Sequence, residues 1–457
     1  MPHYSSDTRT LQPGDTFVAV RGERTDGHAY LAEAVARGAT TLIVENGAAV
    51  SGVPGGVEIM RVPDTIVHLG ELARRRLAEQ RPVVVAVTGS MGKTTTRNAI
   101  ATVAAQGFPV IAPKGNLNTL LGLSLTVLNE LHTAEQGGAG AVLVAEMGAY
   151  QRGDLAQICA YIRPDIAVVT NVRPVHLERM GSIENVALAK GEIVDALTER
   201  GTACLNADDP LVAAMAARCR GRVLAYGAQA PPTDSSVAIS PALIQAPIPL
   251  LGAYQVYTAL AAFSVGRCLG LSDAAINAGL AQLKPEKGRL KRLAGLNGSR
   301  LIDDTYNASR DSMLAALEVL AAPEMRAAPV GLAGQPAARR MAVLGDMLEL
   351  GSVEQAAHRE VVARALVAAD SVVLVGPRLA AAAAELGAGP RVTTFANSRE
   401  AGDAQAAGQL LHPQPGDLIL LKGSEGMRME RITEQLIAPE VDREHELPRQ
   451  DVAWKQI

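Results

Sequence analysis

Several kinds of residue and segment are scarce in this sequence, and each absence narrows what the chain can be. The four cysteines are scattered without a close pair, so they indicate neither a disulfide framework nor a zinc site, and they fit a reducing compartment. Aromatic residues make up 3% of the chain, which argues against a platform for stacking nucleic-acid bases. No apolar run reaches the roughly 18 residues of a membrane span, and the amino terminus lacks the apolar core of a signal peptide. These absences predict a cytoplasmic protein without membrane insertion.

An excess of charge of one sign is missing as well. The net charge is −4, from 43 basic and 47 acidic side chains, so electrostatics favours neither nucleic acid nor an anionic membrane as a partner. What is present is an ordinary core-forming composition, 48% hydrophobic and 20% charged. A chain of 457 residues has room for about three domains of roughly 150 residues each.

Short β-rich runs alternate with helical patterns along most of the chain, which is typical of parallel α/β sheets. Examples are VVVAVT, AVLVAEM and TACLNADD, and further along RLIDDTY, MAVLGDM and DLILLKG. We therefore expect an α/β protein with three domains. They are a small α/β domain over residues 1–80, a central phosphate-loop domain with a parallel sheet over 81–285, and a Rossmann-like domain over 286–440. The polar segment 441–457 is expected to be a disordered tail.

The stretch VVVAVTGSMGKTTT, residues 83–96, carries the clearest chemistry. A buried strand is expected to end at Thr88 and a helix to begin near Lys93, so the glycines between them gather backbone N–H groups around one anion site. Lys93 would reach the terminal phosphates of a nucleotide, and the Thr94 hydroxyl a magnesium ion. The common spacing of such loops places a further glycine where this chain has Val87, which a shorter loop would explain.

Three further side chains bear on that chemistry. Glu146 follows a predicted strand, at the edge where the ligands of open α/β sheets collect, and its carboxylate can hold magnesium. His176 lies in a loop after another strand, and Lys190 lies within a predicted helix. Such a histidine is more often structural, and such a lysine is nearly always a solvated charge, so neither indicates a function by itself.

The motifs TGSMGKTTT, AEMG, TNVRPVHLERMGS and AKGEI occur here in the order that they have in the Mur ligase family, which the chain resembles. DDTYNASRDSMLAALEVL, VLGDMLELG and LLKGSEGMRMER resemble the MurF group of that family in particular. The similarity runs from residue 6 to about residue 437 and includes the stretch SDTRTLQPGDTFVAVRGERTDGHAY. The family's phosphate loop is of the short form, which accounts for Val87.

The resemblance implies an ATP-dependent amide ligase that adds D-Ala-D-Ala to UDP-N-acetylmuramoyl-tripeptide through an acyl phosphate, in peptidoglycan synthesis. It also implies magnesium, with a second ion if Lys190 is carbamylated. Each domain then has its own substrate: the first holds the UDP end, the central one ATP, and the last the incoming amine. We expect the chain to be a monomer that binds no nucleic acid.

Matched position by position, the resemblance assigns roles to individual residues. The catalytic residues are Lys93, His176 and Lys190, and the magnesium ligands are Thr94, Glu146, His176 and Lys190. The nucleotide contacts are Gly89, Ser90, Gly92, Lys93, Thr94, Thr95, Asn206, Arg289 and Asp304, with Asp209 and Tyr306 beside them. The substrate contacts are Asp7, Arg9, Arg24 and His28 for the uridine diphosphate, Asn116 for the muramoyl-peptide, Asn307 near the nucleotide, and Lys422 and Ser424 for the dipeptide.

The chain departs from the family's pattern at several places. Tyr254 replaces a histidine and Thr258 an asparagine in a segment that contacts the nucleotide in relatives, and the span 227–252 is shorter than usual. Arg173 stands where glycine is usual, and Arg310 where proline is usual. Two alternatives therefore stay open: a related Mur-type ligase with a different amine acceptor, and a catalytically weakened paralog that binds nucleotide. The sequence also leaves open whether the tripeptide carries diaminopimelate or lysine.

Overall fold

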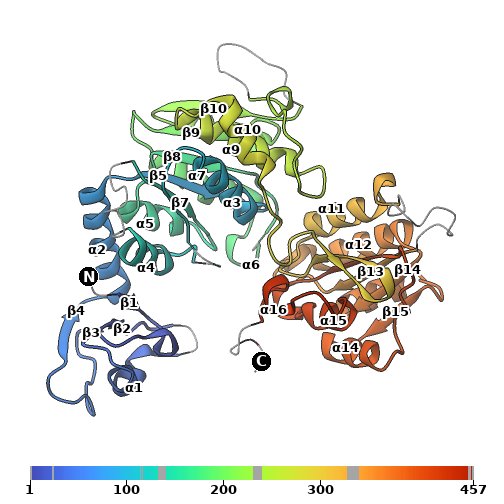
Figure 1. Ribbon diagram of the computed structural model, residues 1–457, viewed down its shortest axis with the longest axis horizontal. Coiled ribbons are helices and arrows are strands. Elements are labelled where there is room, and N and C mark those ends of the chain that lie inside the picture. Colours follow the sequence, from blue (N-terminus) through green and yellow to red (C-terminus); the bar gives the residue numbers. More distant parts are fainter. Residues whose placement is uncertain are drawn as a thin grey trace. The chain divides into compact units, whose positions relative to one another are not determined.

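The computed structural model describes residues 3–22, 25–113, 115, 117–131, 140–175, 177–229, 239–326, 339–450 and 454 (Figure 1). Its contacts divide the chain into two compact units. The first comprises residues 1–172, 184–246 and 257–281, and the second comprises 173–183, 247–256 and 282–457. Over the described ranges, no helix combines the length and the apolar character that crossing a bilayer requires.

The amino-terminal sheet has four parallel strands in the order β1-β2-β3-β4. Its elements are β1 (Tyr4–Ser5), β2 (Thr16–Val18), α1 (Leu31–Ala36), β3 (Thr41–Glu45), β4 (Glu58–Val62) and α2 (Thr65–Gln80). Phe17, Leu31 and Leu42 belong to one small buried core beneath this sheet. Shortly after α1, Gly38 adopts a φ of 101°, the left-handed conformation that commonly ends a helix.

The first strand of this sheet is supported by a side chain of the central region. The Asn129 amide accepts a hydrogen bond from the Tyr4 backbone N–H at 2.8 Å and donates one to the Tyr4 carbonyl at 2.8 Å. The amide therefore pairs with the open edge of β1 as a neighbouring strand would. α2 packs along α4 (Leu120–Glu130), and a Cβ on Gly70 of α2 would lie 2.9 Å from the Tyr161 ring.

The central sheet has six parallel strands in the order β10-β9-β8-β5-β7-β6. The strands are β5 (Val83–Thr88), β6 (Val110–Ile111), β7 (Val142–Glu146), β8 (Ile166–Val169), β9 (Thr202–Asn206) and β10 (Arg222–Tyr226). The accompanying helices are α3 (Lys93–Ala104), α4, α5 (Asp154–Tyr161), α7 (Ile183–Asp195), α8 (Pro210–Ala213), α9 (Gln255–Cys268) and α10 (Asp273–Ala281). After β5 the chain builds one side of the sheet and then returns to build the other. The carboxyl end of β5 is therefore a switch point, where such sheets bind ligands.

The second unit contains a six-stranded sheet in the order β11-β12-β16-β13-β14-β15, parallel except for the edge strand β11. The strands are β11 (Lys291–Ala294), β12 (Arg300–Asp304), β13 (Arg340–Gly345), β14 (Ser371–Val375), β15 (Val392–Phe395) and β16 (Leu418–Lys422). The helices are α6 (Leu177–Met180), α11 (Arg310–Ala321), α12 (Glu354–Ala368), α13 (Pro377–Glu385), α14 (Ser398–Ala406), α15 (Glu430–Leu436) and α16 (Arg443–Glu446). The α/β class with parallel sheets that the sequence predicts is confirmed.

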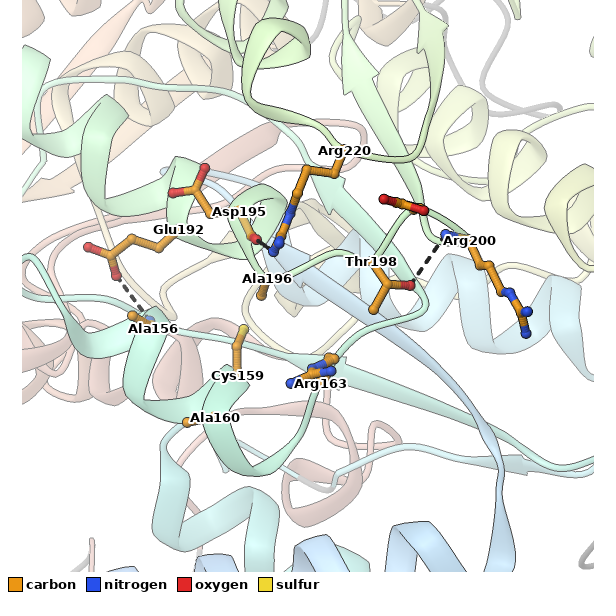
Figure 2. Close-up of a pocket in the computed structure, with 11 residues that line it drawn as sticks. Ala156, Cys159, Ala160, Arg163, Glu192, Asp195, Ala196, Thr198, Arg200 and Arg220 are labelled. Carbon is orange, nitrogen blue, oxygen red and sulfur yellow. Dashed lines mark hydrogen bonds between the residues drawn. The ribbon is translucent and has the colours of Figure 1, made fainter.

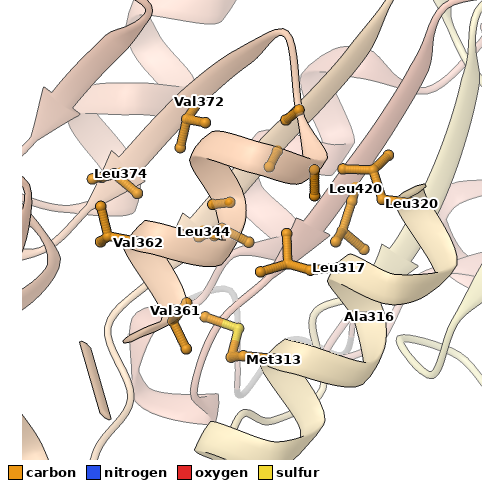
Figure 3. Packing of buried hydrophobic residues seen from close by; sticks show 14 of the residues in the cluster. Met313, Ala316, Leu317, Leu320, Leu344, Val361, Val362, Val372, Leu374 and Leu420 are labelled. Atoms are coloured by element: carbon orange, nitrogen blue, oxygen red, sulfur yellow. The ribbon is translucent and has the colours of Figure 1, made fainter. Parts of the chain in front are cut away.

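This sheet is buried on both faces, and alternate residues of β16 show it. Leu420 belongs to the same buried cluster as Leu317 of α11 and Val361 of α12 (Figure 3). Ile419 belongs instead to the cluster that holds Leu447, near the end of the chain. Each fully buried leucine or isoleucine contributes about 1.5–3 kcal/mol relative to an exposed one. The two cores fix the register of β16, because a shift by one residue would exchange its two faces.

Residues 441–450 are ordered, contrary to the expectation of a disordered tail. α16 begins after Asp442, whose side chain accepts hydrogen bonds from the backbone N–H groups of Glu444 and His445. Leu447 is 0% exposed. The polar composition that suggested disorder is real, but one buried leucine and a helix cap are enough to anchor the segment.

Candidate active site

The stretch between β5 and α3 forms the loop that the sequence predicts. β5 ends at Thr88 and α3 begins at Lys93, with Gly92 at a φ of 76° before the helix. Gly89 adopts a φ of 148°, and a Cβ on it would lie 1.9 Å from the Thr170 hydroxyl, so only glycine fits there. The loop and the first turn of α3 thus present backbone N–H groups to one anion site.

Lys93 curls back over this loop. Its ammonium group donates to the Gly89 carbonyl at 3.0 Å and lies 3.4 Å from the Ser90 carbonyl. Thr94 and Thr95 follow in the first turn of α3, both partly buried. The positive charge is therefore held against the phosphate loop, where the phosphates of a nucleotide would bind.

The loop after β8 holds the phosphate loop in shape. The Thr170 hydroxyl donates to the Met91 carbonyl at 2.7 Å. The Asn171 amide contacts Met91 twice, accepting from its N–H at 2.9 Å and donating to its carbonyl at 3.1 Å. The Ser90 N–H donates to the Asn171 carbonyl at 2.9 Å. Sequence reasoning gave Thr170 and Asn171 no role, since nothing in the sequence reveals which strand neighbours β5.

Asn206 and Asp209 extend that support. The Asn206 amide donates to the Thr170 carbonyl at 2.9 Å and accepts from the Asp208 N–H at 3.1 Å. The Asp209 carboxylate accepts from the Val172 N–H at 2.9 Å and also caps α8. The Asn206 amide therefore donates to one residue and accepts from another within the loops after β8 and β9. Through these loops, Asn206 supports the phosphate loop.

Glu146 has the environment of a magnesium ligand. It ends β7, paired in register with Val87 of β5, and is 3% exposed. One carboxylate oxygen accepts from the Asn118 amide at 3.3 Å, and the other is buried with no hydrogen-bond partner among the described groups. A buried carboxylate oxygen without a donor is costly unless a cation satisfies it. The residues present therefore fit magnesium.

Lys190 is a buried amine rather than the solvated charge that its place in a helix suggests. It lies within α7, 2% exposed. Burial, and then the charge of Lys93, lower the pKa of Lys190 well below its ordinary value. The described residues contain no group of three His, Cys, Asp or Glu side chains placed to hold a metal. Three predicted site residues lie outside the described residues: Arg24, Asn116 and His176.

In the second unit, Asp304, Asn307 and Lys422 come together at the ends of β12 and β16. The Lys422 ammonium lies 2.7 Å from the Asp304 carboxylate and donates to the Asn307 carbonyl at 2.8 Å. Burial raises the pKa of Asp304, and the charge of Lys422 opposes that rise. Lys422 is only 2% exposed, so it bridges the two strand ends and fixes the loop that carries Asn307.

Arg289 and Tyr306 lie beside this group. The Arg289 guanidinium stacks on the Tyr306 ring, 4.1 Å from its centre. The next residue, Leu290, donates its N–H to the Asp304 carboxylate at 3.1 Å. The turn before β11 and the loop after β12 are thereby joined, which brings Arg289 and Asp304 together as the sequence suggests.

Ser424 fixes a neighbouring motif, GDMLELG, that the sequence analysis used only to identify the family. Its hydroxyl accepts from the Leu348 N–H at 2.9 Å and donates to the Ala308 carbonyl at 3.3 Å. On the other side, His358 is 1% exposed and accepts from the Met347 N–H at 3.0 Å. Sequence reasoning missed His358, because a single histidine within an amphipathic helix carries no signal of its own.

The predicted uridine-diphosphate residues differ in their surroundings. Asp7 and Arg9 form a close pair, with a nitrogen–oxygen distance of 2.6 Å, and the Arg9 hydrogen bonds lower the pKa of Asp7. The His28 ring is engaged at both nitrogens: Nδ1 lies 2.6 Å from the Asp26 carboxylate and Nε2 accepts from the Glu45 N–H at 3.0 Å. Asp7 and Arg9 thus pair near the surface, and His28 is hydrogen-bonded within its domain, while the contacts of all three with uridine diphosphate stay predictions.

Two of the departures from the family's pattern meet at one carboxylate. Arg173 lies 3.5 Å from the Asp311 carboxylate, and Arg310 lies 2.7 Å from it. Arg310 is the first residue of α11, a position that proline also favours, and it pairs with Glu360 at 2.6 Å. The two arginines therefore belong to one network of ion pairs within the second unit, so each of the two substitutions has a partner carboxylate.

The shortened segment after β10 keeps a firm attachment. Asp208 accepts from the Ala228 N–H at 2.6 Å and from the Tyr257 hydroxyl at 3.0 Å. Thr258 is 6% exposed within α9, and Tyr254 is 47% exposed. Thr258 is thus a packed helix residue, whereas Tyr254 presents its ring to solvent.

A hollow of about 780 Å³ lies near the amino-terminal ends of strands β8, β9 and β10 of the central sheet (Figure 2). It is lined by α5, by the end of α7 and by the loops that precede β8, β9 and β10, whereas the phosphate loop follows β5. Its charged side chains balance: Arg163, Arg200, Arg220, Glu192, Asp195 and Glu199. Glu192 accepts from two backbone N–H groups at the start of α5, and Arg220 donates to the Asp195 carbonyl at 2.8 Å. Balanced and internally bonded charges do not favour an anion, so this hollow is not the nucleotide site.

Comparison with known proteins agrees with this arrangement. Three sequence models match: the catalytic domain of the Mur ligase family over residues 3–77, the Mur ligase middle domain over 87–266, and the Mur ligase glutamate ligase domain over 288–425. A UDP-N-acetylmuramoyl-tripeptide–D-alanyl-D-alanine ligase of Bacillus subtilis is 32% identical over 448 residues, which cover 95% of this chain and 92% of that protein.

Solved structures give the same answer. MurF from Acinetobacter baumannii superposes with a TM-score of 0.77 at 27% identity, over 94% of this chain and 92% of that one. MurF ligase from Thermotoga maritima, in complex with ADP, superposes with a TM-score of 0.75 at 28% identity, over 95% of this chain and 96% of that one. The chain belongs to the Mur ligase family, within its MurF group.

Proposed function

We propose that this chain is an ATP-dependent, ADP-forming ligase that joins D-Ala-D-Ala to UDP-N-acetylmuramoyl-tripeptide. The observation that carries the proposal is the phosphate loop at the switch point of the central sheet, with the orphaned Glu146 oxygen at the end of the neighbouring strand. The activity of the curated relative and the ADP bound by the Thermotoga maritima protein support it.

The chemistry follows from the need to activate a carboxylate. The tripeptide carboxylate attacks the terminal phosphorus of ATP, forming an acyl phosphate and releasing ADP. The amine of D-Ala-D-Ala then attacks the acyl carbon, phosphate leaves, and an amide is formed. Lys93 and the loop N–H groups neutralise and orient the transferring phosphoryl group.

Magnesium is part of the proposal. Thr94, Glu146 and His176 would hold it, and when bound it would neutralise charge on the phosphates. Lys190 would hold a second ion as its carbamate. The lowered pKa of Lys190 supports this, because only the neutral amine reacts with carbon dioxide. Burial thus favours the neutral form of Lys190, which is the form that this modification needs.

The remaining substrates are assigned to the other domains. Asp7 and Arg9 of the first domain, residues 1–80, would contact the uridine diphosphate. In the C-terminal domain, 286–440, Lys422 and Ser424 would lie near the incoming dipeptide. Asn307, whose carbonyl accepts from Lys422, would lie near the nucleotide. One chain supplies every site, so we propose a monomer that acts in the cytoplasm, where ATP is made.

The test is a phosphate-release assay with ATP, D-Ala-D-Ala and UDP-N-acetylmuramoyl-tripeptide carrying either diaminopimelate or lysine. We expect release only when both other substrates accompany ATP, and the preferred tripeptide identifies the third residue. Release that needs the tripeptide but accepts only another amine would indicate a related ligase with a different acceptor. ATP turnover that ignores both substrates would reject the proposal.

Lys93→Ala separates the roles of the domains in the same assay. It should abolish phosphate release while leaving binding of the UDP-linked substrate within about twofold of the parent, because a point charge in the phosphate loop does not contact that substrate. Nucleotide binding without any release in the parent chain would point instead to a weakened paralog.

A further inference from the structure

We infer that the end of the chain positions the nucleotide-facing residues of the C-terminal domain. The positioning element is a strap, defined here as residues 443–450 together with Trp454, and its central residue is Arg449. Through Tyr306, the strap holds the Arg289 guanidinium in place. This inference rests on the proposed function, together with the nucleotide contacts that the family resemblance assigns to Arg289 and Asp304. The strap follows the segment matched by the Mur ligase domain models, which ends at residue 425.

The first half of the strap is fastened to the turn that carries Arg289. The Lys287 ammonium donates to the Glu444 carbonyl at 2.7 Å, and the Lys291 ammonium lies 2.6 Å from the Glu446 carboxylate. These two lysines flank Arg289 in the sequence. Leu447 then enters the core that lies on one face of the sheet. The strap is therefore held by a hydrogen bond, an ion pair and apolar burial.

Arg449 fixes the loop after β12, which contacts the turn that carries Arg289. Its side chain is 4% exposed, and its two terminal nitrogens donate to the carbonyls of Tyr306, at 2.9 Å, and Thr305. The guanidinium also lies 3.1 Å from the Glu430 carboxylate. A planar fork of donors can satisfy two carbonyls and a carboxylate at once, which an ammonium cannot do with the same geometry.

Cations and aromatic rings alternate across this region. The Tyr306 ring has the Arg289 guanidinium 4.1 Å from its centre and that of Arg449 at 5.6 Å. The Trp454 ring has the Arg449 guanidinium at 5.9 Å and that of Arg428 at 5.2 Å. Each contact of this kind contributes favourable energy, more so where water is excluded. Arg449 thus links the tryptophan near the end of the chain to the tyrosine that supports Arg289.

The turn and the loop are too close to move independently. The Tyr306 N–H donates to the Gly288 carbonyl at 3.0 Å. Gly288 has a φ of 66°, and a Cβ on it would lie 2.9 Å from the Tyr306 nitrogen and 3.0 Å from the Pro448 ring. A shift of the strap at Pro448 or Arg449 would therefore displace the Tyr306 loop and the Arg289 turn together.

The test uses the full chain and its tryptophan. The sequence contains one tryptophan, Trp454, so intrinsic fluorescence at long wavelength reports on the strap alone. We expect the Trp454 emission to change as ATP and magnesium are added, with a midpoint equal to the dissociation constant for ATP. Emission that stays constant through saturation with ATP would overturn the inference.

Variants supply a second, independent measure. Arg449→Ala should raise the KM for ATP on the order of tenfold, with kcat and the KM values for the other substrates changed less than about twofold. Arg449→Lys should recover part of the loss, since it keeps the charge opposite Glu430 but not the fork. His445→Ala is the matched control, because this exposed side chain on α16 pairs only with its neighbour Asp442 in the described structure; it should match the parent.

Trp454→Leu is a second variant, which keeps the inference testable if the Arg449→Ala protein does not fold. It removes the last ring of the series without removing a hydrogen bond to the Tyr306 loop, and it should raise the KM for ATP about twofold to threefold. A folded Arg449→Ala or Trp454→Leu protein with an unchanged KM for ATP would contradict the inference. If ATP alters the Trp454 emission but no substrate set gives phosphate release, the proposed function fails and the positioning role stands.

Discussion

Asp303, the residue before Asp304 on β12, is a carboxyl group buried with few partners. It is 0% exposed, one oxygen accepts from the Thr305 hydroxyl at 2.7 Å, and the other has no hydrogen-bond partner among the described residues. Burial raises the pKa of Asp303 to about 7. The Thr305 hydrogen bond opposes the rise, and the Asp304 and Glu430 carboxylates add to it. The group is therefore protonated in the folded protein at a pH where it is ionised in the unfolded chain.

We predict that Asp303→Asn stabilises the C-terminal domain, and more so at pH 8 than at pH 5. The folded pKa is raised, so the stability that the proton contributes is fully present below pH 3.8 and is lost as the pH rises through about 7. Asparagine stays neutral throughout and escapes this loss. With these two pKa values, linkage gives a difference of about 2.5 kcal/mol between pH 5 and pH 8, at about 1.36 kcal/mol for each unit.

Thermal unfolding followed by Trp454 fluorescence measures this domain. The melting temperature of Asp303→Asn relative to the parent should be roughly 5 to 10 °C higher at pH 8 than it is at pH 5. Asp370→Asn is the matched control, because it makes the same chemical change at a carboxylate that is 55% exposed. Its melting temperature should differ from that of the parent by the same amount at both pH values. A constant difference for Asp303→Asn as well would show that Asp303 does not titrate between pH 5 and pH 8 in the folded protein and would refute the reasoning.

Three further predictions test the central and amino-terminal regions. Lys190→Met should raise the melting temperature by a few degrees and abolish phosphate release, because it removes a buried amine that serves activity at a cost in stability. A lower melting temperature together with lost phosphate release would contradict this. Gly89→Ala should lower kcat/KM for ATP on the order of 100-fold, since the added Cβ would collide with the Thr170 hydroxyl, and nucleotide titration checks this. Asn129→Ala should destabilise the first sheet by about 1–2 kcal/mol, seen as faster proteolysis near Tyr4 with an unchanged KM for ATP.

The sequence predicts the position of the phosphate loop and the place of Glu146 at a strand end, because both depend on short stretches. A valine-rich strand, glycines and a lysine within 14 residues determine the local turn, and the strand end places the carboxylate. The two-sided burial of the later strands is likewise visible as continuous apolar runs.

Other features depend on residues that are distant in the sequence. The Asn129 amide pairs with a backbone 125 positions away, and Arg449 reaches the Thr305 carbonyl from 144 positions away. Polarity misled the expectation for residues 441–450, because a buried leucine among charged neighbours carries little weight in composition. No local pattern predicts that the His28 ring accepts from the Glu45 N–H or that Lys422 pairs with Asp304, and the assignment of both residues to substrates stays a prediction.

The place of β16 in its sheet has a consequence for synthesis of the chain. This strand comes last in the sequence but lies between β12 and β13, near the middle of the sheet. While the ribosome is still translating residues before Leu418, β12 and β13 each have one edge that lacks its neighbouring strand. This sheet is therefore complete only after Lys422 has emerged, and a nascent chain halted before β16 is a substrate for chaperones rather than a partly working enzyme.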